Sequence, residues 1–138
     1  MPHVTPKITP FLMFEGRAEE AIHFYLSLFE NAEIVAIQRY GAEGPGPEGT
    51  VVHATFTLAG QTFMAIDSFV QHAFTFTPSM SLYVTCETEA EIDRLFAALS
   101  GGGSVMMPLA AYPFSEKFGW LADRFGVSWQ LTLAKATG

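Results

Sequence analysis

The order of the expected secondary-structure elements repeats once along the chain, and this repeat restricts the fold more than any other feature. Each half reads as one strand, one amphipathic helix and three further strands. One constant shift along the sequence places Leu12 on Leu82 and Ile22 on Ile92. Because the same order and similar residues occur twice, the sequence predicts two copies of one βαβββ module.

The first half begins with a strand-like run at residues 8–14, followed by a helical pattern at residues 17–30. Apolar side chains in the helical segment recur at the spacing of a single helix face. They are Ala18, Ala21, Ile22, Tyr25 and Phe29. Three strands are then expected, over residues 32–40, 50–59 and 61–67.

The second half repeats this order from residues 79–86, where apolar and polar side chains alternate as in a half-buried strand. Thr88 and Glu91 form a T-x-x-E capping box, which predicts the start of a helix. The glycines at 101–103 end that helix. Three further strands are expected, over about residues 104–109, 116–122 and 127–133.

These patterns predict an α+β fold in which residues 1–138 form a single domain. Module one spans about residues 6–67, a linker covers 68–78, and module two spans about 79–133. We expect the two modules to form a curved mixed sheet around a cleft, with the helices on the outside. The segment 41–49, rich in glycine and proline, forms either a solvated loop or a lid over that cleft.

Charge and composition exclude several classes of protein. A net charge of −7 argues against binding to nucleic acid or to an anionic membrane surface. No apolar run is long enough to span a bilayer and the first residues lack a signal-peptide core, so we expect a cytoplasmic protein. The single cysteine excludes an intramolecular disulfide framework. Because 49% of the residues are hydrophobic, we expect apolar surface to remain for a homodimer.

Strand alternation directs one set of side chains to the side opposite the helices, and we expect them to converge on one ligand site. The set is His53, Thr55, Ser81, Tyr83, Ser128 and Gln130. Trp120 joins it, either stacking on a flat ligand or packing in the core. His53 is either a hydrogen-bonded strand residue or an acid/base group, and Gln130 either satisfies buried partners or contacts the ligand.

Other reactive residue types suit structural roles. Asp67 ends a strand and is expected to cap a turn, and Asp123 lies in a turn of its own. Cys86 falls on the core side of its strand, which predicts a buried, inert thiol. Phe114 and Phe118 suggest an apolar wall or a dimer seam. No catalytic residue is assigned, because the sequence has no catalytic-triad, phosphate-loop or paired-carboxylate spacing.

The helix segment EEAIHFYLSLF (19–29) and the closing run GWLADRFGVSWQL (119–131) resemble the vicinal oxygen chelate superfamily. This superfamily includes glyoxalase, bleomycin-resistance and extradiol dioxygenase proteins. The resemblance covers about residues 6–133 and is greatest to the PhnB-like branch, often described as demethylubiquinone methyltransferase-like. A methyltransferase with a nucleotide fold needs a glycine-rich loop between a strand and a helix, and the stretches 41–49 and 101–103 do not lie there.

The resemblance also implies where a metal would bind, because metal-dependent members carry four ligands on the first, fourth, fifth and eighth strands. The matching positions here are Pro10 or Phe11, residues 63–65, Ser81 and Gln130. Only one of these is a plausible ligand, so we expect no metal and no other cofactor.

These observations favour a metal-independent protein that binds an unidentified small molecule. The alternative is an enzyme of the same superfamily, of lyase, isomerase or dioxygenase type, with a non-standard metal or acid/base site. His53 and Gln130 would be its first candidate residues. An interaction module without small-molecule chemistry would leave the polar faces of the strands without a purpose.

Overall fold

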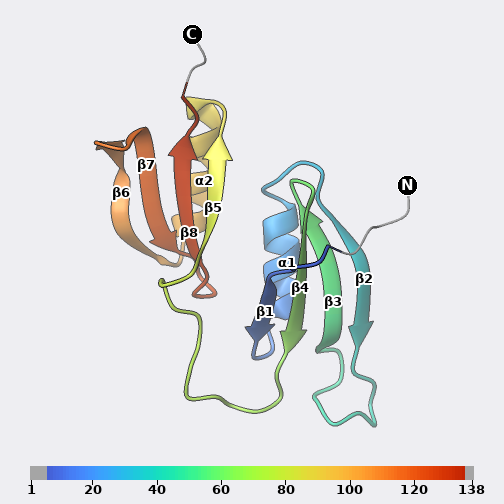
Figure 1. The fold of residues 1–138 in the computed structure, drawn as a ribbon. Coiled ribbons are helices and arrows are strands. Elements are labelled where there is room, and N and C mark those ends of the chain that lie inside the picture. The colour runs from blue at the N-terminus through green and yellow to red at the C-terminus, as the bar shows by residue number, and fades with distance from the viewer. Residues whose placement is uncertain (1–5, 136–138) are drawn as a thin grey trace. The chain divides into compact units, whose positions relative to one another are not determined.

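The computed structural model describes residues 6–135, and contacts divide the chain into two compact units between His72 and Ala73. We call residues 6–72 unit one and residues 73–135 unit two. Each unit contains one helix and one four-stranded sheet, in the order β-α-β-β-β (Figure 1). The predicted α+β fold with tandem βαβββ modules is therefore confirmed, with one separate sheet in each unit.

Unit one contains β1 (Phe11–Phe14), α1 (Ala18–Leu26), β2 (Glu33–Arg39), β3 (Val51–Leu58) and β4 (Gln61–Asp67). The strand order is β1-β4-β3-β2. Strand β1 runs parallel to β4, and the other neighbours are antiparallel. The first strand of the unit therefore lies beside its last strand, as a β-α-β-β-β order permits.

Unit two contains β5 (Ser81–Cys86), α2 (Glu89–Ser100), β6 (Ser104–Tyr112), β7 (Ser115–Ala122) and β8 (Ser128–Leu133). The strand order is β5-β8-β7-β6, with β5 parallel to β8 and the other pairs antiparallel. The two units thus have the same topology.

The core of unit one lies between α1 and one face of its sheet. Four helix residues are buried: Ala18, Ala21, Ile22 and Tyr25. On the sheet, Ala54, Phe56 and Leu58 alternate with less buried neighbours along β3. Phe56 stacks on Phe63 of β4, with ring centroids 5.5 Å apart. Burial of this face is the main stabilising term, and it leaves the opposite face of the sheet without a helix.

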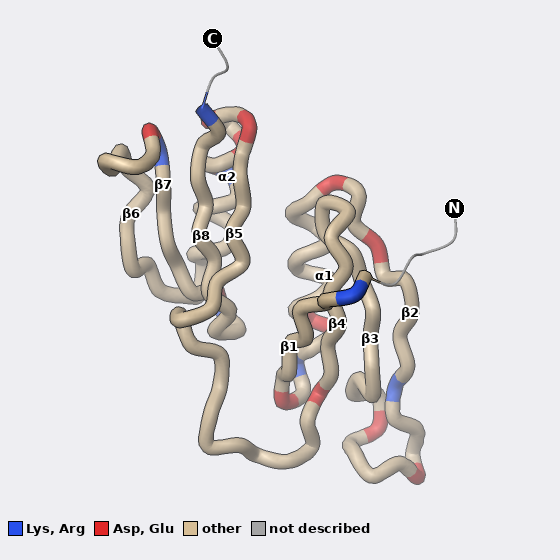
Figure 2. The backbone as a smooth tube through the Cα atoms, viewed as in Figure 1, with Lys and Arg blue, Asp and Glu red and all other residues tan. Residues whose placement is uncertain are grey.

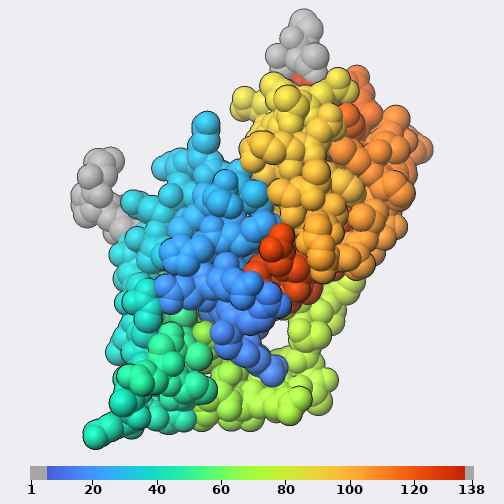
Figure 3. Space-filling view, turned by 180° about the vertical axis from the view of Figure 1, so that it is seen from behind, coloured from blue at the N-terminus to red at the C-terminus, as the bar shows by residue number. Residues whose placement is uncertain are grey.

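Unit two is built in the same way, with Ile92, Leu95 and Leu99 of α2 buried against its sheet. The sheet contributes Cys86, Leu121, Trp129 and Leu131 to this core. Helix α2 approaches β7 closely at Gly119, where an added Cβ atom would lie 2.4 Å from Cε2 of Phe96. A side chain at this position would require the Phe96 ring to move. In a space-filling view from behind, α1 (blue) and α2 (yellow) each form part of the surface of their unit (Figure 3).

Some helices and strands begin or end at other residues than the sequence predicts. Strand β1 starts at Phe11 rather than residue 8, because Pro10 has no N–H group to donate to a ladder. Helix α1 ends at Leu26, and the Ser27 hydroxyl donates to the carbonyl of Phe24 at 2.6 Å. The expected helix start at Thr88 is confirmed, because its side chain accepts a hydrogen bond from the Glu91 N–H group at 3.1 Å.

The segment 41–49 has no helix or strand and folds around the ring of Tyr40. The Tyr40 carbonyl accepts a hydrogen bond from the Gly49 N–H group at 2.9 Å. Gly46 is buried against the ring, and an added Cβ atom would lie 2.8 Å from Tyr40 Cε2. Within residues 6–135, no helix is long and apolar enough to cross a membrane.

Candidate functional site

The helix-free face of unit two, meaning the sheet face opposite α2, places an amide between two aromatic side chains. Strand β8 lies between β5 and β7, and Gln130 of β8 is paired with Tyr83 of β5 and Trp120 of β7. Paired residues project to the same side of a sheet, so these three side chains form one row across it. Tyr83 is 59% exposed.

A second row of hydroxyl groups lies beside the first and is hydrogen-bonded to it. The Oγ atoms of Ser81 and Ser128 are 2.6 Å apart. Trp120 Nε1 donates to Ser128 Oγ at 2.9 Å, and Gln130 Nε2 donates to Ser81 Oγ at 3.2 Å. Four of the seven residues expected at the ligand site therefore form one network, with Tyr83 beside it.

An aromatic cluster extends this face toward the β6–β7 hairpin. The ring of Tyr83 lies 6.5 Å from that of Phe118, which contacts Phe114 at 4.9 Å and Tyr112 at 5.9 Å. Phe114 is 58% exposed. Sequence reasoning identified the Phe114–Phe118 pair but missed Tyr112. Tyr112 could have been included from the sequence, because aromatic residues alternate at positions 112 and 114 around the hairpin turn.

The helix-free face of unit one carries His53 and Thr55, as strand alternation predicted. In the sheet register His53 pairs with Gln38, and its ring lies 6.1 Å from the ring of Phe11. Thr55 is paired with Met64 on β4. No side chain within residues 6–135 is hydrogen-bonded to the imidazole, so the structure shows no partner that would orient it as an acid or a base.

The donor set on the helix-free faces does not fit a divalent metal ion. Phe11 is paired with Met64 on the first and fourth strands, and neither offers a hard ligand. The hydroxyl of Ser81 and the amide of Gln130 are hydrogen-bonded to each other. Among the described residues, no group of three or more His, Cys, Asp or Glu side chains is arranged to hold a metal ion.

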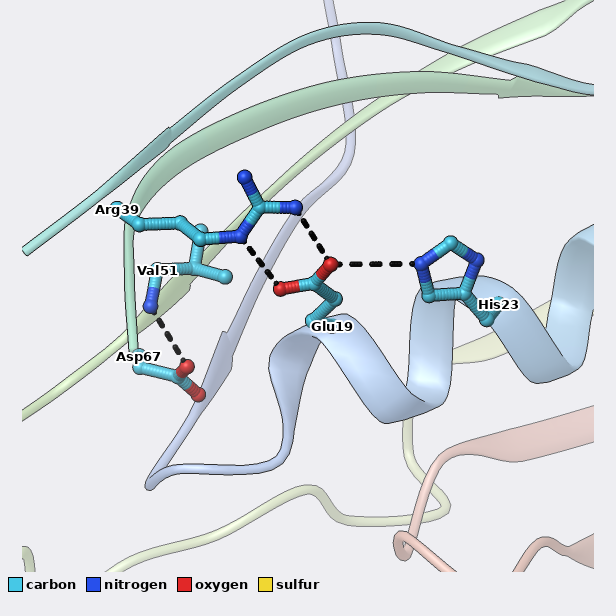
Figure 4. A network of polar contacts seen from close by, with 5 residues as sticks. All are labelled: Glu19, His23, Arg39, Val51 and Asp67. Carbon is cyan, nitrogen blue, oxygen red and sulfur yellow. Dashed lines mark hydrogen bonds and ion pairs between the residues drawn. The ribbon is translucent and has the colours of Figure 1, made fainter. Parts of the chain in front are cut away.

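Asp67 joins three segments of unit one from a buried position. Its Oδ1 atom accepts hydrogen bonds from the N–H groups of Gly16 and Ala18, at 2.8 and 2.9 Å. Its Oδ2 atom accepts one from the Val51 N–H group at 2.9 Å (Figure 4). Because Arg17 at the start of α1 makes no side-chain cap, Asp67 caps this helix from a distant strand. Its role is structural, as expected, although it caps a helix rather than a turn.

Gly16, which is outside the glycine stretches 41–49 and 101–103, lies between β1 and α1 with a φ angle of +112°. A glycine between a strand and a helix is one element of a phosphate-binding turn. Here its N–H group donates to the carboxylate of Asp67, so an internal anion already occupies this position. The turn is therefore not available to a cofactor phosphate.

Glu19 forms an ion pair that connects α1 to β2. Arg39 donates to both of its carboxylate oxygens, at 2.8 and 2.6 Å, and Nε2 of His23 lies 3.4 Å away (Figure 4). The hydrogen bonds from Arg39, together with the smaller effect of His23, lower the pKa of Glu19 from 4.5 to about 2, against the opposing effect of burial. The carboxylate is thus ionised under ordinary conditions and stabilises the fold rather than exchanging protons.

The substitution Glu19→Gln should reduce stability at neutral pH by a small amount, because both side chains of the pair are partly exposed to solvent. Since the folded-state pKa of Glu19 lies below its unfolded value, its contribution is complete above pH 4.5 and is lost as the pH falls toward 2. Urea unfolding of both proteins at several pH values should show the two midpoints converging in acid. Glu15→Gln is the control, because Glu15 has no ion-pair partner within residues 6–135.

Two further residues have structural roles. Cys86 is fully buried, and burial together with the charge of Glu91 raises the pKa of its thiol to about 12, against the opposing charge of Arg94. Asp123 is also buried, and its carboxylate accepts hydrogen bonds from the N–H groups of Phe125 and Val127 and from Trp129 Nε1. Neither is available for nucleophilic or acid/base chemistry.

Unit one also contains a pocket of about 260 Å³ next to the start of α1. Its walls include Gly16, Pro47, Phe69 and Val70. None of the seven residues expected at the ligand site lines it. Pro47 belongs to the segment 41–49, so that segment forms one wall of this pocket.

Comparison with known proteins agrees with the architecture. The family model described as 3-demethylubiquinone-9 3-methyltransferase matches residues 6–132. An uncharacterized protein of Mycobacterium tuberculosis strain H37Rv, Rv0887c, is 30% identical over 135 residues, which cover 94% of this chain and 75% of that protein. These similarities extend over nearly the whole chain.

Two solved structures show the same fold. A protein from Bacillus cereus described as a putative 3-demethylubiquinone-9 3-methyltransferase, PhnB protein, is 69% identical. The similarity covers 94% of this chain and 100% of that chain, with a TM-score of 0.92. A glyoxylase/bleomycin resistance protein/dioxygenase domain from Frankia sp. is 13% identical with a TM-score of 0.66, and the similarity covers 98% and 96% of the two chains. The second similarity concerns the fold alone.

Proposed function

This chain belongs to the 3-demethylubiquinone-9 3-methyltransferase family, the PhnB-like group with a glyoxalase/bleomycin-resistance fold, and we propose that it binds a small organic molecule without a metal ion. The helix-free face of unit two is the main binding surface in this proposal. On unit one, taken by itself, His53 and Thr55 are the proposed contact residues of the helix-free face. Its cellular location in the proposal is the cytoplasm, where a buried free thiol such as Cys86 stays reduced.

One observation carries the proposal, namely the hydrogen-bonded network of Trp120, Ser128, Ser81 and Gln130 beside exposed aromatic rings. Small-molecule sites combine apolar and aromatic walls with a few fixed polar groups, and this face has both. Neither β5 nor β8 carries a charged side chain (Figure 2). The surface is therefore suited to an uncharged ligand rather than to a phosphorylated one.

Native mass spectrometry of the freshly purified protein tests the proposal. We expect the chain to carry an organic molecule in a fraction of the population, with no mass increment for a divalent metal ion. The same spectra report the oligomeric state, for which the proposal includes a homodimer. Stoichiometric metal that is lost in Gln130→Leu would contradict the metal-free proposal and favour the enzyme alternative.

Two variants locate the bound molecule. Tyr83 and Phe69 are 59% and 53% exposed, and only Tyr83 lies on the helix-free face of unit two. We expect Tyr83→Ala to lose the bound molecule and Phe69→Ala to keep it. The opposite result would place the ligand in the pocket beside α1 and contradict the proposed site.

A further inference from the structure

Ser81 and Ser128 form a pair of hydroxyl groups on the helix-free face of unit two, and within residues 6–135 one of their two protons has no acceptor. Trp120 and Gln130 both donate to the pair, so neither can accept a proton from it through the same contact. One serine proton is used between Ser81 and Ser128, at an Oγ–Oγ distance of 2.6 Å. Since two hydroxyl groups carry two protons, one O–H group remains to be satisfied.

Burial determines which serine keeps the unused proton. Ser128 is 1% exposed, whereas Ser81 is half-buried. A buried hydroxyl group without an acceptor is costly, so Ser128 donates to Ser81. The oxygen of Ser81 then accepts from both Ser128 and Gln130, and its own proton points away from the network.

Gln130 supplies the complementary group. Its Nε2 atom is directed at Ser81, and its Oε1 atom accepts no hydrogen bond from another side chain within residues 6–135. The face therefore presents one hydroxyl donor and one carbonyl acceptor on adjacent strands, β5 and β8. A ligand that satisfies both must carry an acceptor and a donor close together.

The residues around this donor–acceptor pair indicate the shape and the charge of the remainder of the ligand. Tyr83 and Trp120 lie on either side of Gln130, and aromatic rings favour flat, apolar partners. The nearest cation on β7, Lys117, is ion-paired with Asp93 of α2 at 2.6 Å. Glu116 and the net charge of −7 disfavour an anion.

We propose that unit two recognises a neutral, flat aromatic carboxamide or lactam. The N–H group of the ligand donates to Gln130 Oε1, the ligand carbonyl accepts from Ser81 Oγ, and its ring lies against Tyr83 and Trp120. This inference rests on the proposed small-molecule function and adds the chemical class of the ligand.

Three naphthalene probes with different polar groups test the class of ligand. 2-Naphthamide has a donor and an acceptor, 2-acetylnaphthalene has only the acceptor, and 2-naphthoate carries a negative charge. In ¹⁵N NMR spectra of the full chain, 2-naphthamide should shift the Trp120 Nε1–H and Gln130 Nε2–H signals. It should bind at least tenfold more tightly than the other two probes.

Variants of β5 and β8 test the two polar contacts, and a second hydroxyl group on β5 provides the matched control. Ser81→Ala and Gln130→Leu should each remove most of the preference for 2-naphthamide over 2-acetylnaphthalene. Thr85→Ala removes a hydroxyl group from the same face of β5 outside the network and should leave the preference unchanged. Two independent variants, Ser81→Ala and Gln130→Leu, keep the test valid if one of them fails to fold.

The outcomes separate this inference from the proposed function. Equal binding of all three probes, or a preference that survives both variants, would overturn the carboxamide class while the small-molecule function stands. Absence of any probe binding in a protein that retains an organic molecule in native mass spectra would do the same. Absence of both probe binding and a co-purified molecule would overturn the proposed function as well.

Discussion

Replacing Asp67 by alanine should lower the free energy of unfolding by about 3–5 kcal/mol, because it removes a buried carboxylate that accepts three backbone hydrogen bonds. The N–H groups of Ala18 and Val51, which are buried, and that of Gly16 would lose their acceptor. This loss would detach the start of α1 from the sheet, with a large effect on a domain of ordinary stability.

Urea unfolding followed by circular dichroism is the appropriate measurement for Asp67→Ala. Both tryptophans of the chain lie in unit two, so their fluorescence does not report directly on the site of this substitution. Asp67→Asn should lower the free energy of unfolding by less than Asp67→Ala. Its amide oxygen can still accept hydrogen bonds from Gly16 and Ala18, and only the Val51 N–H group faces another donor, the amide nitrogen. A loss below about 1 kcal/mol for alanine would show that the three contacts are unimportant.

Asp123→Ala should have a comparable effect in unit two, of about 3–5 kcal/mol. The carboxylate accepts from two backbone N–H groups in the turn between β7 and β8, at 2.8 and 3.1 Å. It also accepts from Trp129 Nε1 at 2.9 Å, which fixes the largest fully buried side chain of the core. Loss of this residue would loosen both the turn and the packing against α2.

A double-mutant cycle separates these two contributions of Asp123. Asp123→Asn keeps an oxygen for the turn and loses the indole contact, and Trp129→Phe removes the indole donor from the other side. If the indole contact matters, the two changes together should cost less than the sum of the single changes. If the losses in free energy of unfolding of the two single variants simply add up in the double variant, the whole effect of Asp123 would be assigned to the turn.

Local patterns were sufficient to predict the elements and their faces. The period-two alternation of β3 and β8 correctly predicted that His53 and Gln130 lie away from the helices. Such alternation depends only on neighbouring residues, because successive side chains of a strand point to opposite faces. The expectation that the faces of both units line one cavity stays a prediction.

Contacts between distant residues could not be predicted in the same way. Ser81 and Ser128 are 47 positions apart and become hydrogen-bonded because β5 pairs with β8 in one particular register. Asp67 was expected to cap a turn, but it caps α1 through the N–H group of Ala18, 49 positions away, because β4 lies beside β1. Neither partner can be identified from spacing along the chain.

The sequence by itself therefore determined the order of the elements, the core side of β3, β5 and β8, and the uncharged character of the β5 and β8 surface. Each of these follows from the period of the chain or from residue type. Tertiary structure alone decided that Gln130 lies between Tyr83 and Trp120 and that the hydroxyl groups of Ser81 and Ser128 are hydrogen-bonded to each other. The physical reason is that strand register is set by pairing between segments far apart in the sequence, and a shift of one residue would send every one of these side chains to the opposite face.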